Sequence, residues 1–204
     1  MNAEAPPRGL TGILRSLNCD RAYGWALLGA CASLGLLELG GEPVRAALSY
    51  QRAGIAAGEW WRLLTAHFVH LDASHALLNS LGLVLMWALF ARDYSPLRWA
   101  AIYLVSALAI SVGLYVFDPQ LEWYVGASGA LHGVMSAGTL AHVRRGDLDG
   151  WILAAFIVAK LSYEQFAGAM PFSGAGNTVV DAHLYGAIVG LVLALLLRSR
   201  AEPQ

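Results

Sequence analysis

The chain has 204 residues, of which 57% are hydrophobic and only 13% are charged, and its formal net charge is -1. With a mean hydropathy of +0.54, it is too apolar for a water-soluble domain of this length, and we expect an all-α integral membrane protein. The near-neutral charge, with no basic cluster beyond Arg144 and Arg145, argues against a nucleic-acid partner and leaves the lipid bilayer as the expected surroundings.

Six apolar stretches approach the length that a bilayer crossing needs. We predict spans at residues 22–39, 75–91, 98–117, 128–143, 150–168 and 181–198. They form one six-span domain over 22–198, between short tails at 1–21 and 199–204. No internal repeat, linker or second domain is visible.

The basic residues predict the orientation of these spans. If the chain crosses six times, most of the Lys and Arg residues fall on one side of the membrane: Arg8, Arg15, Arg21, Arg92, Arg98, Arg144, Arg145, Arg198 and Arg200. Of the opposite-side loops, 118–127 and 169–180 contain no Lys or Arg, whereas the long loop 40–74 contains Arg45, Arg52 and Arg62. The positive-inside rule therefore predicts that both termini are cytoplasmic.

Lys160 and Glu164 lie inside the predicted fifth span, one helical turn apart, where they can pair and lessen the cost of buried charge. We interpret this pair as structural. The two cysteines, Cys19 and Cys31, fall at different depths, which disfavours a disulfide and excludes a cysteine-based metal site. A lipoprotein signal ending at Cys31 is also disfavoured, because the apolar run continues to Leu39.

Polar residues open three of the spans, in the stretches HALLN (75–79), GASGALHG (126–133) and DAHLYGAIVG (181–190). Each begins an even-numbered span, and these spans all run from the outside to the inside. At 1.5 Å per residue, His75, Ser128 and His183 lie about 26, 24 and 22 Å above the arginines that end their spans. The three segments therefore place polar groups at one level, several Å below the outer surface.

Ser128 and His183 permit nucleophilic chemistry. A serine hydroxyl attacks poorly until a neighbouring base accepts its proton, and His183 is the candidate base on a facing span. Small residues allow the two helices to approach closely: Gly129 and Gly133 on one span, Gly186 and Gly190 on the other. These glycines can equally serve helix packing alone.

An acyl-transfer site also needs donors for the tetrahedral oxyanion. His75 and Asn79 are four residues apart and so share one face of the second span, near its positive N-terminal end. The backbone N–H of Ser128, at a helix start, is a third candidate donor.

Together these motifs resemble the rhomboid intramembrane serine proteases. EWWRLLTAHFVH (59–70) is similar to the family's first loop, HALLN to its His-x-x-x-Asn motif, GASG to its Gly-x-Ser-Gly motif, and HLYGAIVG to its last-helix His and Gly-x-x-x-Gly. The resemblance implies a six-helix bundle with a membrane-embedded first loop, Ser128 as nucleophile, His183 as base, and His75 with Asn79 as oxyanion donors. It implies no cofactor, no metal and no third catalytic acid, and we assign Asp181 no catalytic role.

Gly126, Gly129, Gly186 and Gly190 are expected to support this site. One position departs from the family pattern: His132 stands where many rhomboids carry an aromatic residue that stacks on the catalytic histidine. We expect His132 to stack or to form a hydrogen bond in the same place.

SGALHG and WWRLLTAHFVHL look most like the rhombosortase branch. That likeness implies a multi-pass protein of the bacterial inner membrane whose active site opens to the extracytoplasmic side. The implied clients end in a Gly-Gly motif, a transmembrane helix and a basic tail. Spans two and five are expected to part to admit the client, beneath a mobile cap formed by loop 169–180 with Pro171, Gly174 and Gly176.

Four alternatives stay open. The chain could be a general rhomboid protease with other single-span clients, or a non-catalytic relative that binds clients, although such relatives usually lack the Ser or the His. His67, His70 and His75 could form the metal site of a metalloprotease, but no His-Glu-x-x-His motif is present. The fourth alternative is a transporter, which is possible for any six-span protein, but no inverted repeat is visible.

Overall fold

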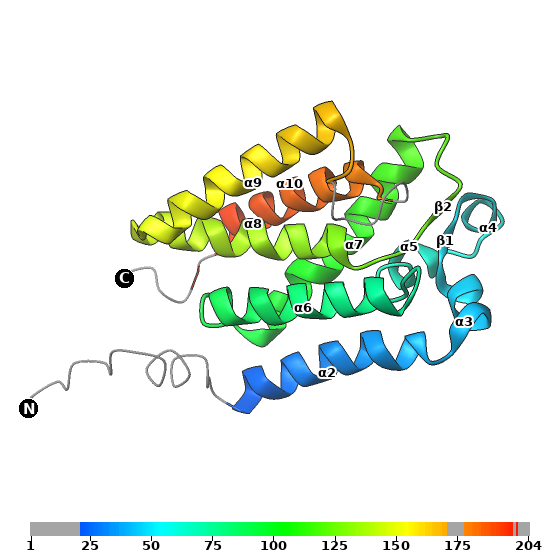
Figure 1. Ribbon diagram of the computed structural model, residues 1–204, viewed down its shortest axis with the longest axis horizontal. Coiled ribbons are helices and arrows are strands. Elements are labelled where there is room, and N and C mark those ends of the chain that lie inside the picture. Colours follow the sequence, from blue (N-terminus) through cyan, green and yellow to red (C-terminus); the bar gives the residue numbers. More distant parts are fainter. Residues whose placement is uncertain (1–20, 171–177, 198, 200–204) are drawn as a thin grey trace, which may run out of the picture.

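The computed structural model describes residues 21–170, 178–197 and 199, and this part of the chain is mostly helical (Figure 1). Its elements in chain order are α2 Arg21–Glu38, α3 Gly41–Leu48, β1 Tyr50–Gln51, α4 Arg52–Ala56, α5 Arg62–Thr65, α6 Ala73–Phe90, α7 Pro96–Phe117, β2 Trp123–Tyr124, α8 Ser128–Arg145, α9 Leu148–Ala167 and α10 Val180–Leu196. The cap residues Pro171, Gly174 and Gly176 lie outside the described residues.

Each of the six predicted spans corresponds to one long helix, and every boundary agrees within two residues. By length and composition alone, α6 and α7 could each cross a membrane. The segments Gly24–Glu38 and Gly41–Leu48, which are bent by 111°, add a third if they count as one span. The protein is thus helical with several apolar helices, and the number of crossings stays a prediction.

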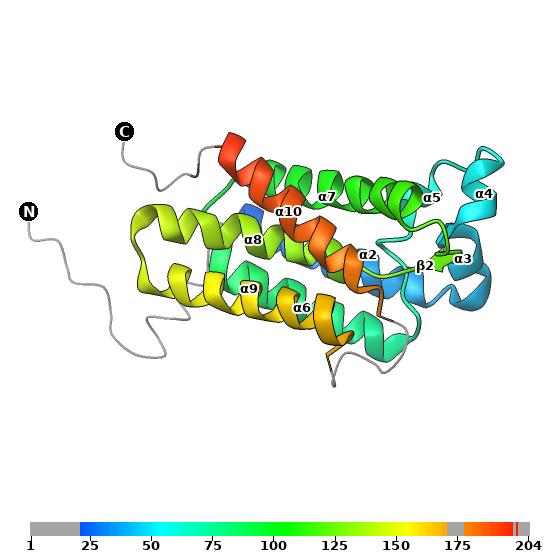
Figure 2. The same cartoon turned by 90° about the horizontal axis from the view of Figure 1, so that it is seen from above.

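The centre of the bundle is α8, and this explains its low apolar content. Most of its residues are buried by neighbouring helices, so its surface is made of small and polar side chains rather than lipid-facing ones. It packs most extensively against α10 and also contacts α6, α7 and α9. Figures 1 and 2 show it between α6 and α10 in one view and between α7 and α9 in the other.

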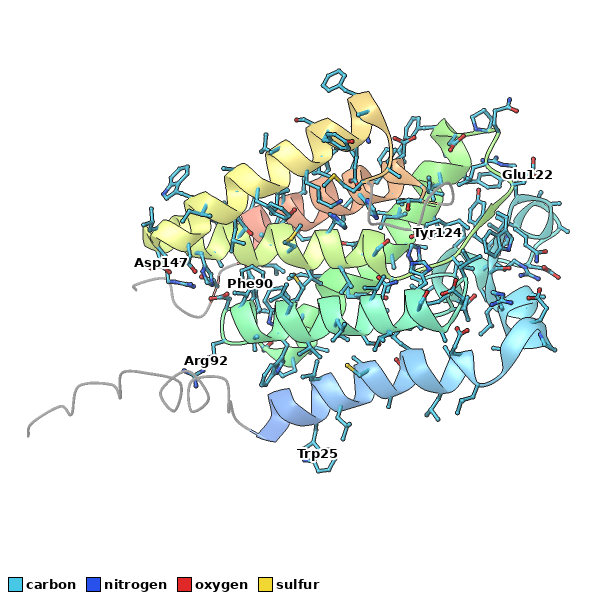
Figure 3. The ribbon with its side chains drawn as sticks, in the orientation of Figure 1. Trp25, Phe90, Arg92, Glu122, Tyr124 and Asp147 are labelled. Atoms are coloured by element: carbon cyan, nitrogen blue, oxygen red, sulfur yellow. The ribbon has the colours of Figure 1, made fainter. Side chains whose placement is uncertain are left out.

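The helices α6, α8 and α10 all begin at the end of the bundle that carries α3, α4 and α5 (Figure 1). There the two-stranded sheet joins the first loop to the segment before α8, with Tyr50 opposite Tyr124 and Gln51 opposite Trp123. In Figure 3, Glu122 and Tyr124 mark this end, and Arg92 and Asp147 mark the other. The three polar motifs therefore gather at one end, as the depth comparison predicts.

A cluster of charged side chains, in which Asp93 and His142 are buried, lies at the opposite end of the bundle. Asp93, in the turn after α6, is ion-paired with Arg145 at the end of α8, and its other carboxylate oxygen lies 3.1 Å from Nε2 of His142. Nδ1 of His142 lies 2.7 Å from Asp149 in the first turn of α9. This cluster joins three helices where the chain turns between them.

Candidate active site

Ser128 and His183 meet where α8 and α10 begin. Ser128 is the first residue of α8, and His183 lies in the first turn of α10. The hydroxyl Oγ is 3.0 Å from Nε2 of the imidazole, within hydrogen-bond range. His183 is only 5% exposed, so this contact lies inside the bundle rather than on its surface.

Glycines bring the two helices close enough for this contact. A Cβ built on Gly186 would lie 2.0 Å from the carbonyl oxygen of Gly129, and a Cβ on Gly190 would lie 2.0 Å from that of Gly133. Real Cβ contacts do not occur at such distances, so only glycine fits at these two positions with the helices as they are. The predicted stripes of small residues face one another and set the separation of α8 from α10.

His132 stacks on His183, one of the two outcomes that the sequence left open, and it forms a hydrogen bond as well. The two rings have centroids 4.2 Å apart and planes inclined by 20°. Nδ1 of His132 lies 2.7 Å from the carbonyl oxygen of Ser128, so this nitrogen carries the hydrogen and donates it. Nε2 is then the nitrogen with the free lone pair, and it is buried.

His75 and Asn79 occupy one face of α6 beside the segment that leads into α8. Asp72 caps this helix by accepting hydrogen bonds from the Ser74 hydroxyl at 2.6 Å and the His75 N–H at 2.8 Å. These bonds, the one from Ser74 first, hold the pKa of the Asp72 carboxyl below its usual range and keep the cap ionised. The capped first turn therefore fixes the position of the His75 backbone, from which the ring projects.

The His75 ring lies against the backbone of Gly126, two residues before the serine. A Cβ on Gly126 would come within 2.8 Å of Cε1 of that ring, and this glycine has φ +123°, a conformation that L side chains rarely adopt. Asn79 is buried and donates from Nδ2 to the carbonyl oxygen of His75 at 3.1 Å. The second N–H of this amide remains available as a donor.

Glu164 also reaches His183, a contact that the sequence does not predict. The carboxylate of Glu164, on α9, places its two oxygens 3.0 and 3.1 Å from Nδ1 of His183. Lys160, one turn earlier, contacts the same carboxylate at 2.7 Å. The predicted pairing of Lys160 with Glu164 is present, but it faces the histidine of the next helix.

The sequence contained a signal for this contact. Two opposite charges in an apolar span are costly, and they most often face a polar partner on a neighbouring helix. Because Lys160 and Glu164 are spaced to satisfy each other, the sequence favours a self-contained pair. Spacing along one helix does not tell which neighbouring helix the pair faces.

Two arginines hold the first loop together below the site. Arg62, in the stretch EWWRLLTAHFVH, is buried and donates to the carbonyl oxygens of Ala46 and Ser49, both at 2.8 Å. Arg52 donates to four backbone carbonyls near the end of α7: those of Leu114, Tyr115, Asp118 and Leu121. These bonds satisfy carbonyls at a helix end and fasten the loop to α7.

The histidine trio of the metalloprotease alternative does not converge in the described part of the chain. Nε2 of His67 lies 3.0 Å from the hydroxyl of Ser111, and His70 packs edge-on against His75 with ring centroids 5.2 Å apart. Among the described residues, the groups whose donor atoms come within 4.8 Å of one another are His132, Glu164, His183 and His142, Asp147, Asp149. In the first group an ammonium already contacts the carboxylate, which disfavours a cation there.

Comparison with known proteins agrees with these features. The Rhomboid domain family matches residues 57–200. "Putative rhomboid protease YdcA" of Bacillus subtilis is 32% identical over 149 residues, which is 73% of each chain. Rhomboid protease GluP of Bacillus subtilis is 36% identical over 107 residues, half of this chain but only 21% of GluP. RHOMBOID-like protein 2 of Arabidopsis thaliana is 31% identical over 144 residues, or 70% of this chain and 44% of that protein.

The match thus extends over most of the helical bundle and includes all three polar motifs at its site end. The alignments with the individual relatives cover most of YdcA, but less than half of GluP and of the Arabidopsis protein. The chain is a multi-pass membrane protein and belongs to the rhomboid family.

Proposed function

We propose that the chain is an intramembrane serine protease in which Ser128 is the nucleophile and His183 the general base. The observation that carries the proposal is the 3.0 Å contact between Ser128 Oγ and His183 Nε2, at the starts of two closely packed helices. A base at this distance can take the hydroxyl proton as the oxygen attacks a client carbonyl. The names of the relatives YdcA and GluP, both rhomboid proteases, support the same reaction.

His75 and Asn79 stabilise the oxyanion in this proposal. The attack converts the client carbonyl into a negatively charged tetrahedral intermediate, which preorganised N–H donors stabilise in a water-poor site. The second amide N–H of Asn79 and a ring N–H of His75 are such donors, and the first-turn N–H of Ser128 is a third. His183 then returns the proton to the leaving amine, and water hydrolyses the acyl-enzyme by the same route.

We further propose that clients are cut near the extracytoplasmic end of a C-terminal transmembrane helix, at a Gly-Gly segment, as in the rhombosortase branch. Ser128 lies at the end of the bundle opposite to Arg92, Arg144 and Arg145, which the positive-inside rule assigns to the cytoplasm. The site would then open outward from a bacterial inner membrane. Glycine favours this cut because it weakens a helix and exposes its backbone.

The test uses a single-span client with Gly-Gly at the outer end of its helix, reconstituted with the protein. We expect release of the client's ectodomain with a new C-terminus beside the Gly pair, identified by mass spectrometry. Ser128→Ala, His183→Ala and the double variant should be similarly inactive, because both groups act in one step. Full cleavage by Ser128→Ala would refute the serine protease proposal.

Two controls separate the alternatives. A client carrying Leu-Leu in place of Gly-Gly should resist cleavage; if it is cut equally well, the protein is a general rhomboid protease rather than one for Gly-Gly clients. Cleavage should also persist in the presence of a chelator, whereas a metalloprotease would lose it. Client capture without cleavage by the unaltered protein would favour the non-catalytic alternative.

A further inference from the structure

A buried carboxylate faces the side of the His183 imidazole that does not contact Ser128. Glu164 is 1% exposed, and its oxygens lie 3.0 and 3.1 Å from Nδ1, while Nε2 lies 3.0 Å from the serine hydroxyl. The two ring nitrogens therefore have different partners on different helices. A carboxylate accepts hydrogen bonds only, so Nδ1 must carry the hydrogen.

This arrangement selects the tautomer that the proposed chemistry requires. With the hydrogen on Nδ1, the lone pair of Nε2 points at the Ser128 hydroxyl and can accept its proton. When it does, the imidazolium that forms faces the carboxylate of Glu164. A negative charge already in place stabilises that cation without any rearrangement at the moment of reaction.

Lys160 makes a carboxylate tolerable at this depth. Its Nζ lies 2.7 Å from Oε1 of Glu164, and the lysine side chain is 17% exposed while that of the glutamate is fully buried. An isolated carboxylate in the interior would be neutralised by taking up a proton, whereas a paired one can stay ionised. Nζ is 3.5 Å from Nδ1 of His183, so the ammonium lies beside the ring rather than replacing the carboxylate.

The other groups near His183 do not compete for Nδ1. His132 stacks on the face of the ring, and its own Nδ1 is used by the Ser128 carbonyl. His75 approaches from α6, where its ring lies against Gly126. In the described residues, Lys160 and Glu164 are the two groups that contact Nδ1 of His183.

We propose that Glu164 is a positioning residue for His183, held ionised by Lys160, so that the site works as a Ser128–His183–Glu164 relay rather than as a serine–histidine pair alone. The inference rests on the proposed function, because the relay is defined by proton transfer from Ser128. It adds a role to α9, a helix to which the sequence motifs assign none.

The kinetic test compares Glu164→Gln with a double variant, Glu164→Gln with Lys160→Met, in cleavage of the Gly-Gly client. Glutamine keeps the size of the side chain but removes its charge, and we expect kcat to fall roughly 10²- to 10⁴-fold with KM nearly unchanged, by analogy with the loss of the triad carboxylate in a soluble serine protease. The double variant leaves no unpaired charge and should remain as slow. Glu164→Asp, which restores the carboxylate, should regain much of the lost kcat.

Asp181→Asn is the matched control. It also removes a carboxylate, two residues from His183 on the same helix, but no hydrogen bond or ion pair joins that side chain to the ring in the described structure. Its kcat should equal that of the unaltered protein. Return of normal kcat in the double variant would overturn the proposal, because it would mean that the ion pair only balances charge within α9.

A second measurement tests the geometry without catalysis. In protein labelled with ¹⁵N-histidine and held in lipid nanodiscs, we expect a downfield Nδ1–H proton that disappears in His183→Ala and shifts upfield in Glu164→Gln. If no peptide is ever cleaved, this signal still reports whether Glu164 binds Nδ1, so failure of the relay and failure of the protease proposal give different results. Absence of the signal from the unaltered protein would overturn the inference.

Discussion

Replacing Gly186 with alanine should separate the proposed nucleophile from its base. The added Cβ would lie 2.0 Å from the Gly129 carbonyl oxygen, about 1.4 Å short of the 3.4 Å at which ordinary contact begins. Because the obstacle is backbone, a side-chain rotation cannot relieve the overlap, and α10 must move away from α8. Gly129 adjoins Ser128 and Gly186 lies one turn after His183, so this movement acts directly on the 3.0 Å contact.

A displacement of about 1 Å at a reacting centre typically costs on the order of 10² in rate. We therefore expect Gly186→Ala to lower kcat/KM for the Gly-Gly client by about that factor. Overpacking should also cost about 1–3 kcal/mol of folding free energy. Cleavage kinetics and thermal unfolding in the same detergent measure the two effects.

Gly35→Ala is the control for this change. Gly35 lies on α2, its Cβ would meet nothing within 4 Å, and alanine favours a helix over glycine. This variant should keep full activity and unfold no earlier than the unaltered protein. If Gly186→Ala is folded and as fast as Gly35→Ala, then the close approach of α8 and α10 does not set the serine–histidine distance, and the argument fails.

Two further predictions concern the ends of the bundle. Asn79→Ala and His75→Ala should each leave folded protein with turnover reduced by roughly 10²–10³, the usual cost of one lost oxyanion donor, and unchanged turnover in both would show that these side chains only pack. Asp93→Asn should lower the unfolding free energy by roughly 1–3 kcal/mol, because it removes the more buried of the two carboxylates paired with Arg145 and leaves Asp147 as the other, while kcat is unaffected at the far end. A large loss of kcat in folded Asp93→Asn protein would contradict this separation of stability from chemistry.

The sequence predicted the long helices well because their signal is local. Apolar run length and flanking polar residues are properties of each segment alone, and the six predicted ranges agree with the helices within two residues. The closeness of Ser128 to His183 was also predictable, since both sit at helix starts and both are followed by glycines. The short helices α3, α4 and α5 of the first loop were not predictable, because hydrogen bonds from arginines to carbonyls far along the chain hold this loop in place.

The contact of Glu164 with His183 could not be predicted in this way, because it is not a local property of one segment. It depends on the rotation of α9 about its axis and on which helix lies next to it, and neither is encoded in the spacing of Lys160 and Glu164. A pair that can satisfy itself along one helix does not identify which residue on another helix is a third partner. The stacking of His132 could be anticipated only through the resemblance, which supplied the neighbour that the spacing did not.

If client entry requires α9 to move, as expected from the sequence, the position of Glu164 and Lys160 on that helix would couple entry to chemistry. In the entry route expected from the sequence, α9 is one of the two helices that part to admit a client, and among the described residues it carries both groups that contact Nδ1 of His183. An outward swing of this helix by a few Å would break the 3.0 Å contact, so the open enzyme would be a weak hydrolase. Full activity would return only when α9 closes behind the bound helix. Such an enzyme would not cleave peptides that contact its opening only briefly. It would cleave those that stay bound long enough for α9 to close.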